Sequence, residues 1–128
     1  MEEVINIWYG TGENARLSNL APRPFTYKEK KYRSVEHAYQ TWKSGKFYQK
    51  GFDRQGGKSW LPPKTKQRWN LFLMKSLIYK SFLANPVEEK ALLATGDVRL
   101  THWQGKGIWK ETFPRILTEV RTELKNNA

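Results

Sequence analysis

The sequence predicts a mainly α fold, a small orthogonal helical domain with a minor β-strand and hairpin element near its N-terminus. Apolar residues repeat at helical spacing in Ser34–Lys43 and again in Ile116–Leu124. A broad apolar surface of helical length covers Lys64–Leu83, whereas apolar runs of strand length occur near the N-terminal end. At 128 residues the chain suits one domain, residues 1–128, with a modest core.

The N-terminal part of the chain is expected to hold the β structure. Val4–Tyr9 is typical of a short strand, and Gly10–Asn14 is typical of a polar loop with two glycines. Pro24–Tyr27 and Lys31–Tyr32 flank the polar residues 28–30, which predicts a hairpin. Its turn lacks the Asn-Gly pair that two-residue hairpin loops favour.

The segment Ser34–Lys43, with the sequence SVEHAYQTWK, has the most informative helical pattern. Ser34 can cap the helix because its hydroxyl oxygen can accept a backbone N–H of the first turn. Four apolar residues follow at the i, i+3, i+4, i+7 spacing of a core-facing stripe. They are Val35, Ala38, Tyr39 and Trp42.

The same helix has a polar side about a quarter turn away from that stripe. Glu36, Gln40 and Lys43 repeat at the same spacing, so an acid, an amide and an amine point toward the rim of whatever the helix packs against. A cleft would open at such a rim. The alternative is a solvated face on which Glu36 and Gln40 form only an i,i+4 pair.

Three further helices are expected after this segment. The stretch Lys64–Leu83 predicts the most buried helix, which Asn85 and Pro86 end. Pro86 can open the next helix, which is expected to run to about Thr95. Pro114 can open a final helix in the same way, because the first helical turn does not need the N–H that proline lacks. The apolar stripe of that helix is Ile116, Leu117, Val120 and Leu124.

Composition excludes several classes of protein. With zero cysteines the chain has no disulfide, no thiol catalysis and no cysteine-ligated zinc. His37 and His102 are too few for a histidine-rich metal site and lie in no metal-binding motif, so no metal is expected. The chain has no apolar run of membrane-spanning length, and its first residues lack the layout of a signal peptide. We therefore expect a soluble cytoplasmic protein with no membrane partner.

The chain is strongly basic. Its formal net charge is +11 and its pI is about 10.0, which is typical of proteins that bind nucleic acid, an anionic ligand or an acidic partner. Lysine and arginine concentrate in Lys28–Arg33 and in Lys43–Arg68, where aromatic residues are interleaved with them. Basic groups neutralise phosphates and aromatic rings stack on bases, so DNA or RNA is a candidate partner. The alternative is that the lysines solubilise the domain while the aromatic residues fill its core.

Five segments carry family motifs in a fixed order over nearly the whole chain. The most specific is Ser34–Lys43, which matches the block S/T-V-E-H-A-Y-Q-x-x-K. The others are Leu17–Leu20 with Pro22, Lys80–Phe82 with Asn85–Pro86, Leu92–Asp97, and Ile116–Leu124. In these motifs and their order the chain resembles the NADAR (YbiA-like) family.

The resemblance implies a reaction and its catalytic residues. Proteins of this family are implicated in cleaving N-glycosidic bonds, including release of ADP-ribose from modified guanine in nucleic acid and hydrolysis of ribosylated riboflavin-pathway intermediates. The resemblance implies no cofactor. Glu36 and Lys43 are the expected catalytic residues, because a carboxylate can stabilise an electron-poor anomeric carbon and an amine can attack it and hold the sugar as a Schiff base.

Other residues are expected to bind the substrate or its phosphates. Asn19 and Gln40 would orient hydroxyls or an amide of the base. Trp109, with Tyr9 or Trp8, would offer a stacking face, and core packing is the competing role for each tryptophan. The expected substrate-binding residues are Asn19, Gln40, Trp109, Tyr9, Ser18 and His37, and the expected phosphate or nucleic-acid contacts are Lys106, Lys110 and Lys46.

The C-terminal part departs from the family pattern. Relatives carry an Asp shortly before a Trp-Gly pair and then a glycine-rich segment. This chain has Lys106 at the acidic position, Lys110 in place of the glycine, and Glu111 nearest the family's asparagine. Either Glu111 or Asp97 supplies the absent carboxylate, or the activity has changed. Lys106 and Lys110 would favour a diphosphate or a nucleic-acid phosphate.

We therefore expect an N-glycosidase that acts on an ADP-ribosyl or ribosyl-phosphate conjugate, such as ADP-ribosylated guanine in nucleic acid. Two alternatives stay open. One is a binding module that holds an ADP-ribose-like ligand or a nucleic acid without turnover. The other is a purely electrostatic nucleic-acid protein with a degenerate pocket, whose affinity would fall steeply with salt.

Overall fold

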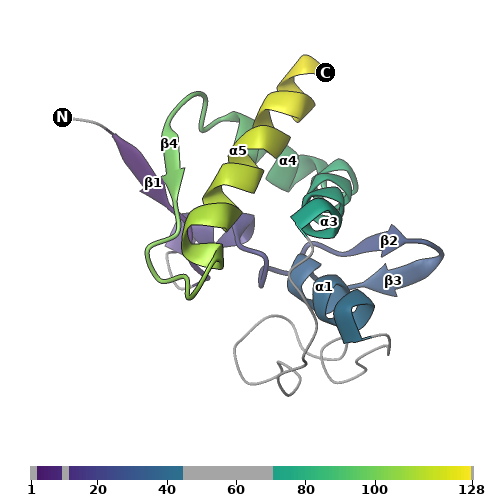
Figure 1. The fold of residues 1–128 in the computed structure, drawn as a ribbon. Helices are drawn as coiled ribbons and strands as arrows, with labels where there is room; N and C mark the ends of the chain where they lie inside the picture. The colour runs from purple at the N-terminus through teal and green to yellow at the C-terminus, as the bar shows by residue number, and fades with distance from the viewer. Residues whose placement is uncertain (1–2, 10–11, 45–70, 128) are drawn as a thin grey trace.

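The computed structural model describes residues 3–9, 12–44 and 71–127. Its elements are β1 (Val4–Asn6), the 3-10 helix η1 (Gly12–Leu17), β2 (Phe25–Tyr27), β3 (Lys30–Tyr32), α1 (Val35–Ser44), α3 (Leu71–Leu83), α4 (Pro86–Leu93), β4 (Arg99–Thr101) and α5 (Trp109–Asn126). Long helices and strands of three residues confirm the expected mainly α class. In Figure 1, α5 crosses the middle of the molecule, between the β1–β4 pair and α3.

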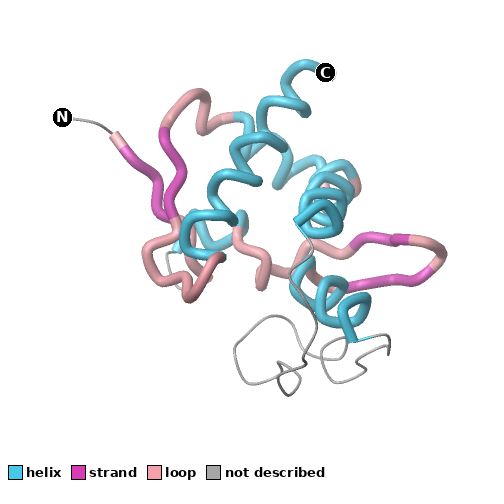
Figure 2. Tube along the Cα trace, in the orientation of Figure 1, coloured by secondary structure: helices cyan, strands magenta, loops and turns pink. Residues whose placement is uncertain are grey.

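Strands β1 and β4 pair in parallel although they are far apart in the sequence, and Figure 2 shows them side by side. The register places Asn6 opposite Thr101, and the backbone N–H of Ile7 extends the ladder by donating to the Thr101 carbonyl at 2.8 Å. The first strand was expected to reach Tyr9, but it ends at Asn6. β4 was not expected, because a three-residue strand is too short to show an alternation of apolar and polar residues.

Strands β2 and β3 form the hairpin that the sequence predicts, and Figure 1 shows it projecting away from the helices. Phe25 lies opposite Tyr32, and both rings are buried with their centres 5.9 Å apart. The turn residues Lys28 and Glu29 have positive φ angles of 47° and 69°. Two such residues in succession form the turn that matches the twist of paired strands. Strand pairing thus imposes this geometry on two residues that do not favour it.

Helix α1 begins where the sequence predicts. Ser34 Oγ accepts the backbone N–H of His37 at 3.1 Å, which satisfies one of the free donors at the helix start. In the predicted apolar stripe, Val35 is fully buried. Trp42 differs, since 38% of it is exposed where it meets Tyr27 of the hairpin edge-on, with ring centres 5.5 Å apart. The beginning of α1 therefore faces the core, and its later part faces the hairpin.

The core lies where α3 packs against α1, α4 and α5. Leu77 and Phe82 of α3 and Leu117 of α5 are fully buried. Because burying one large apolar side chain stabilises a fold by about 1.5–3 kcal/mol, these helices supply most of the stability that positions the other elements. The helix predicted over Lys64–Leu83 is seen from Leu71 onward, and residues 64–70 lie outside the described part.

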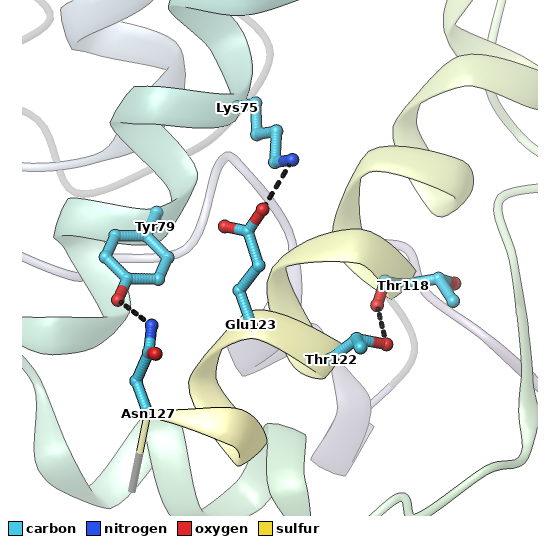
Figure 3. A network of polar contacts seen from close by, with 6 residues as sticks. All are labelled: Lys75, Tyr79, Thr118, Thr122, Glu123 and Asn127. Carbon is cyan, nitrogen blue, oxygen red and sulfur yellow. Dashed lines mark hydrogen bonds and ion pairs between the residues drawn. The ribbon is translucent and has the colours of Figure 1, made fainter.

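Polar contacts at the surface join α3 to the C-terminal part of α5, as Figure 3 shows. Lys75 Nζ on α3 lies 2.7 Å from Glu123 Oε1 on α5, and Asn127 donates to the Tyr79 hydroxyl at 3.1 Å. The hydrogen bond to Glu123 raises the pKa of Lys75. Both members of this pair reach solvent, so salt screens their attraction and the apolar core outweighs it.

Helix α5 begins at Trp109 and not, as predicted, at Pro114. Pro114 is buried inside the helix, where it cannot donate to the carbonyl of Lys110 four residues before it. The earlier turn forms nonetheless, because the N–H of Thr112 donates to the Ile108 carbonyl at 3.0 Å. The prediction was wrong because proline is also tolerated one turn further into a helix when only one hydrogen bond is lost.

Two smaller elements also differ from their predictions. The 3-10 helix Gly12–Leu17 replaces part of the loop predicted at Gly10–Asn14. Helix α4 begins at Pro86 as predicted but ends at Leu93, and Thr95 beyond it donates through Oγ1 to the Leu92 carbonyl at 2.6 Å. In the part of the chain that the structure describes, the helices are too short or too polar to cross a membrane.

Replacing the cap residue should test how α1 is held. Ser34→Ala is expected to lower the free energy of unfolding by about 1 kcal/mol, because the His37 N–H loses its acceptor. Urea denaturation followed by circular dichroism measures the change. Thr122→Ala is the control: Thr122 is exposed on α5 and bonds only its own helix (Figure 3), so its effect should stay within about 0.5 kcal/mol. Equal effects of the two substitutions would contradict a capping role for Ser34.

Candidate functional site

A pocket of about 460 Å³ opens where five parts of the chain meet. These are the residues that follow β1, the turn after η1, the first turn of α1, the beginning of α3, and the segment from the end of β4 to the first turns of α5. Because the parts are far apart in sequence, only the folded chain forms the pocket. It is lined by Trp8, Ser18, Asn19, Leu20, Glu36, Met74, His102, Gln104, Gly105, Lys106, Trp109 and Phe113.

Glu36 brings a carboxylate to this pocket from the first turn of α1. Its backbone N–H donates to the Asn19 carbonyl at 3.0 Å, which joins the start of the helix to the turn after η1. Its Oε1 accepts a hydrogen bond from Gln40 Nε2 at 2.8 Å. The i,i+4 pair that was the alternative to a functional role therefore forms, and its acid still lines the pocket. The hydrogen bond from Gln40 thus orients the Glu36 carboxylate at the pocket.

The turn after η1 supplies an amide and a hydroxyl. Asn19 Nδ2 donates to the sulfur of Met74 at 3.3 Å, and a thioether is a weak acceptor. Asn19 Oδ1 is buried and has no hydrogen-bond partner within the described residues. A buried acceptor without a partner costs about 1–3 kcal/mol, which a ligand N–H or O–H would remove. Ser18 Oγ accepts the Leu20 N–H at 3.2 Å, so the Ser18 hydroxyl proton can be donated elsewhere.

Arg23 holds this turn in place, and the sequence analysis missed it. The side chain is buried, with only 1% exposed. Its Nη1 donates to the carbonyls of Arg16 and Ser18 at 2.8 and 2.6 Å, and its Nε donates to Ser81 Oγ of α3 at 3.2 Å. One side chain thus ties the pocket turn to α3, which was predicted to be the most buried helix but leaves Phe72 83% exposed. An arginine between two prolines gives no sign in the sequence that it is buried.

The charge of Arg23 is retained despite this burial. Burial lowers its pKa to about 9, and the negative charge of Glu88 opposes that shift. The guanidinium lies 4.2 Å from the ring centre of Phe82, where the face of the ring attracts a cation. Arg23 is therefore a buried cation at neutral pH. Its Nε and Nη1 groups make the hydrogen bonds that hold the turn, whereas Nη2 is buried without a hydrogen-bond partner among the described residues.

Trp109 forms part of the aromatic side of the pocket. Its ring centre lies 5.5 Å from that of Tyr39 and the planes cross at 86°, so a core residue supports the indole edge-on. The same indole lines the pocket with Trp8 and Phe113. Core packing and pocket lining, which were competing roles for Trp109, therefore occur together. Tyr9, the other candidate for this wall, does not line the pocket.

Asn6 shapes the loop that follows β4. Its Oδ1 accepts hydrogen bonds from Thr101 Oγ1 at 3.1 Å and from the Trp103 N–H at 2.8 Å. Its Nδ2 donates to Gln104 Oε1 at 2.8 Å. Three hydrogen bonds from one side chain fix the path of the loop and bring His102 and Gln104 to the pocket.

His102 is a pocket residue to which the sequence analysis gave no functional role. Its Nδ1 lies 2.6 Å from the Ile7 carbonyl oxygen, and its ring centre lies 5.1 Å from that of Phe113. A histidine directly after a strand is the sequence signal that could have identified His102 as a site residue. That signal is visible only if β4 is recognised as a strand, and β4 was not predicted.

The structure brings together five of the predicted site residues and separates others from them. Gln40 and Lys110 are described but do not line the pocket. His37 is fully buried with its ring centre 5.3 Å from that of Tyr32, so it packs in the core and does not reach the pocket as the substrate-binding prediction required. The predicted residues that line the pocket are Glu36, Asn19, Ser18, Trp109 and Lys106.

Two predicted lysines cannot be placed. Lys43 belongs to the last turn of α1, but its side chain lies outside the described part, and all of Lys46 does. In an ideal helix Lys43 would lie two turns from Glu36, about 10 Å along the axis and on the same side. Their roles stay predictions.

Neither of the two residues proposed to replace the absent family acid lines the pocket. Glu111 is exposed on α5. Asp97 lies near Arg121, whose pKa burial lowers while Asp97 opposes the shift. Among the described residues that line the pocket, Glu36 is the carboxylate. In that same part of the chain no three histidine, aspartate or glutamate side chains gather as they would around a metal ion.

This arrangement of helices and short strands is a YbiA-like fold, as the sequence predicts. The chain is similar to the solution NMR structure of the E. coli protein YbiA, with a TM-score of 0.74 and 21% sequence identity. The similarity covers 99% of this chain and 88% of that one. At this identity the likeness establishes the fold alone. No protein-family model matches the sequence, and no curated protein matches it.

Arg23→Lys should show that the geometry of the guanidinium matters as well as its charge. Lysine keeps the cation but cannot reach both carbonyls and Ser81 together. We expect the free energy of unfolding to fall by about 1–3 kcal/mol, because buried acceptors lose their donors. Urea denaturation measures the loss. Arg115→Lys on the exposed side of α5 is the control and should change the free energy by less than about 0.5 kcal/mol. A loss no larger than the control's would contradict the role given to Arg23.

Proposed function

We propose that the protein is an N-glycosidase that cleaves the bond between ribose and a base in an ADP-ribosyl or ribosyl-phosphate conjugate. The observation that carries the proposal is the Glu36 carboxylate, oriented by Gln40 in a largely apolar pocket beside the Asn19 amide. An oriented carboxylate against apolar walls stabilises a positively charged anomeric carbon more than it would in water. This is the charge that develops when a C1–N bond breaks.

The dimensions and the lining of the pocket suit a ligand of nucleotide size. Its volume of about 460 Å³ lies within the range of roughly 300–1,000 Å³ that is common for small-molecule sites. Trp109 and Trp8 offer rings against which a base can pack. Lys106, exposed on the loop, can pair with a diphosphate. Ser18 and Asn19 are suited to hydrogen bonds with ribose hydroxyls.

Lys43 supplies the nucleophile in this proposal. Its neutral amine attacks C1 of the ribose while the C1–N bond breaks, and the electron pair of that bond moves to the base nitrogen, which takes a proton. Loss of the amine proton and opening of the ribose ring leave a Schiff base between Lys43 and C1. Water then hydrolyses the Schiff base, which frees ADP-ribose and restores the amine. Glu36 balances the positive charge that develops on the anomeric carbon as the C1–N bond breaks.

The positive charge favours a conjugate carried on nucleic acid. The hairpin displays exposed lysines at Lys28, Lys30 and Lys31, and Lys28 Nζ lies 5.0 Å from the ring centre of Trp42. A basic surface with an aromatic ring can hold the phosphates and bases of a strand. A free metabolite would need only the pocket.

A binding module without turnover is the second candidate, and the charges of the pocket favour it. Lys106 lies where the family pattern has an acid, and neither Asp97 nor Glu111 lines the pocket. One carboxylate beside a lysine suits retention of an anionic ligand as well as its cleavage. The two candidates differ in what Glu36→Gln changes, since an enzyme would lose turnover and a binding module would lose only affinity.

Glu36→Gln is expected to slow the release of ADP-ribose from ADP-ribosylated guanosine by about 100-fold or more, because a neutral amide cannot balance a cationic anomeric carbon. Release is measured with the conjugate free and within an oligonucleotide. In parallel, borohydride is added to trap a Schiff base, and intact mass and peptide mapping locate it. An adduct at Lys43 that is lost in Lys43→Arg supports the covalent route.

Glu119→Gln is the matched control, because Glu119 is an exposed acid on α5 far from the pocket lining. It should leave release unchanged. Tight binding of the conjugate with neither adduct nor release would contradict the glycosidase and favour the binding module. Binding that disappears at moderate salt and is indifferent to Glu36→Gln would instead favour a purely electrostatic nucleic-acid protein.

A further inference from the structure

We propose that His102 is the acid–base residue of this pocket and gives a proton through Nε2 to the leaving base. The inference rests on the proposed glycosidase function and adds to it the group that moves the proton. Three observations carry it: the tautomer that Ile7 imposes, the fixed position of the ring, and its place in the same pocket as Glu36.

Ile7 determines which ring nitrogen carries a proton. A carbonyl oxygen only accepts, so the 2.6 Å contact requires a hydrogen on Nδ1, which donates to the Ile7 oxygen. In the neutral imidazole Nε2 then carries the lone pair, and in the imidazolium both nitrogens donate. The bond to Ile7 persists in both forms. His102 can therefore gain or lose a proton at Nε2 without turning its ring.

Two further contacts fix the ring. Phe113 meets it edge-on, with centres 5.1 Å apart and planes crossing at 71°. On its Cδ2 side, a Cβ atom at Gly105 would lie 2.5 Å from His102 Cδ2 and 2.7 Å from Lys110 Cα, so only glycine leaves room there. Cδ2 is bonded to Nε2. Because Gly105 lies close to Cδ2, it restricts movement of the ring edge that carries the Nε2 lone pair. In the described part of the chain, no side chain or backbone group forms a hydrogen bond with Nε2.

The β1–β4 pairing determines which carbonyl meets the histidine. The N–H of Ile7 donates to the Thr101 carbonyl at 2.8 Å, and the carbonyl of the same Ile7 accepts the Nδ1 proton of His102, the residue that follows Thr101. Asn6 bonds the same loop through Thr101 Oγ1 and the Trp103 N–H. The orientation of the imidazole is thus a product of the strand register, and it does not depend on a flexible side-chain contact.

The charged groups that share the pocket with His102 suit an acid. Glu36 comes from α1 and Lys106 from the same loop as His102, while the neighbouring Met74 and Phe113 are apolar. An acid beside a carboxylate is the pair of groups that glycoside cleavage commonly uses.

The proton transfers balance over one turnover. The imidazolium gives its Nε2 proton to the base nitrogen as the C1–N bond breaks and its electron pair moves to that nitrogen. The neutral imidazole then takes a proton from the water whose oxygen bonds to C1 of the Lys43 Schiff base. One water is consumed, and His102, Glu36 and Lys43 return to their starting states.

The test compares His102→Gln with the wild type on two glycosides of ADP-ribose. ADP-ribosylated guanosine needs a proton on its leaving nitrogen, whereas the 4-nitrophenyl glycoside releases 4-nitrophenolate without one. We expect the substitution to slow release from the guanosine conjugate by about 100-fold or more and release of 4-nitrophenolate by less than about fivefold. Trp103→Ala is the matched control, because Trp103 is 57% exposed on the same loop and does not line the pocket.

Each outcome supports or overturns the proposal. Equal losses on both substrates, or no loss on the guanosine conjugate, overturn the role of His102 and leave the glycosidase intact. A wild-type protein that cleaves neither substrate overturns the proposed function itself. Two results would leave the comparison of substrates without an answer: the wild type does not cleave the nitrophenyl glycoside, or circular dichroism shows that His102→Gln does not fold. In either case the imidazole ¹⁵N spectrum of the wild type tests the role of His102. A neutral ring protonated at Nδ1, with an Nε2 resonance that shifts when ADP-ribose is added, supports the proposal, and protonation at Nε2 or an unshifted resonance overturns it.

Discussion

The buried guanidinium of Arg23 is the interaction on which the candidate site depends most. It joins the turn after η1 to Ser81 of α3. The Asn19 carbonyl of that same turn accepts a hydrogen bond from the Glu36 N–H. A line of contacts thus runs from α3 to the carboxylate of the pocket. Burying an ion costs several kcal/mol, which its hydrogen bonds to two carbonyls and a hydroxyl offset. The position of Glu36 is therefore set by the core, although its side chain reaches the pocket.

Much of the fold follows from patterns within single segments. The cap at Ser34, the hairpin and the helix start at Pro86 were all predicted, because each depends on a few adjacent residues. Two elements did not follow from these patterns. β4 is a strand only because β1, which is far away in sequence, lies beside it, and local propensity contains no information about that partner. α5 starts before Pro114 because the N–H groups of Trp109 and Thr112 donate to the carbonyls of Lys106 and Ile108.

The site was predictable to the extent that it lies on α1 and on recognisable family motifs. Glu36, Asn19 and Trp109 were identified in this way, and all three line the pocket. His37 belongs to the same motif, but its position on the helix turns it into the core against Tyr32. Arg23 and His102 could not be identified as site residues from the sequence. Both act through backbone carbonyls, and any residue can present a carbonyl, so only the folded chain shows which ones they meet.

Because β1 and β4 are far apart in the sequence, their pairing closes a loop that contains nearly every other element, with α5 following it. Strands of three residues contribute few hydrogen bonds, and contacts of such long range are among the last to form and the first to open. Opening this pair would withdraw Ile7 from His102 while the α3–α5 core persisted. The protein would then still present the Glu36 carboxylate, but its imidazole would be free to rotate. The pocket is in this sense complete only when β1 and β4 are paired, and two strands of three residues control the orientation of the imidazole.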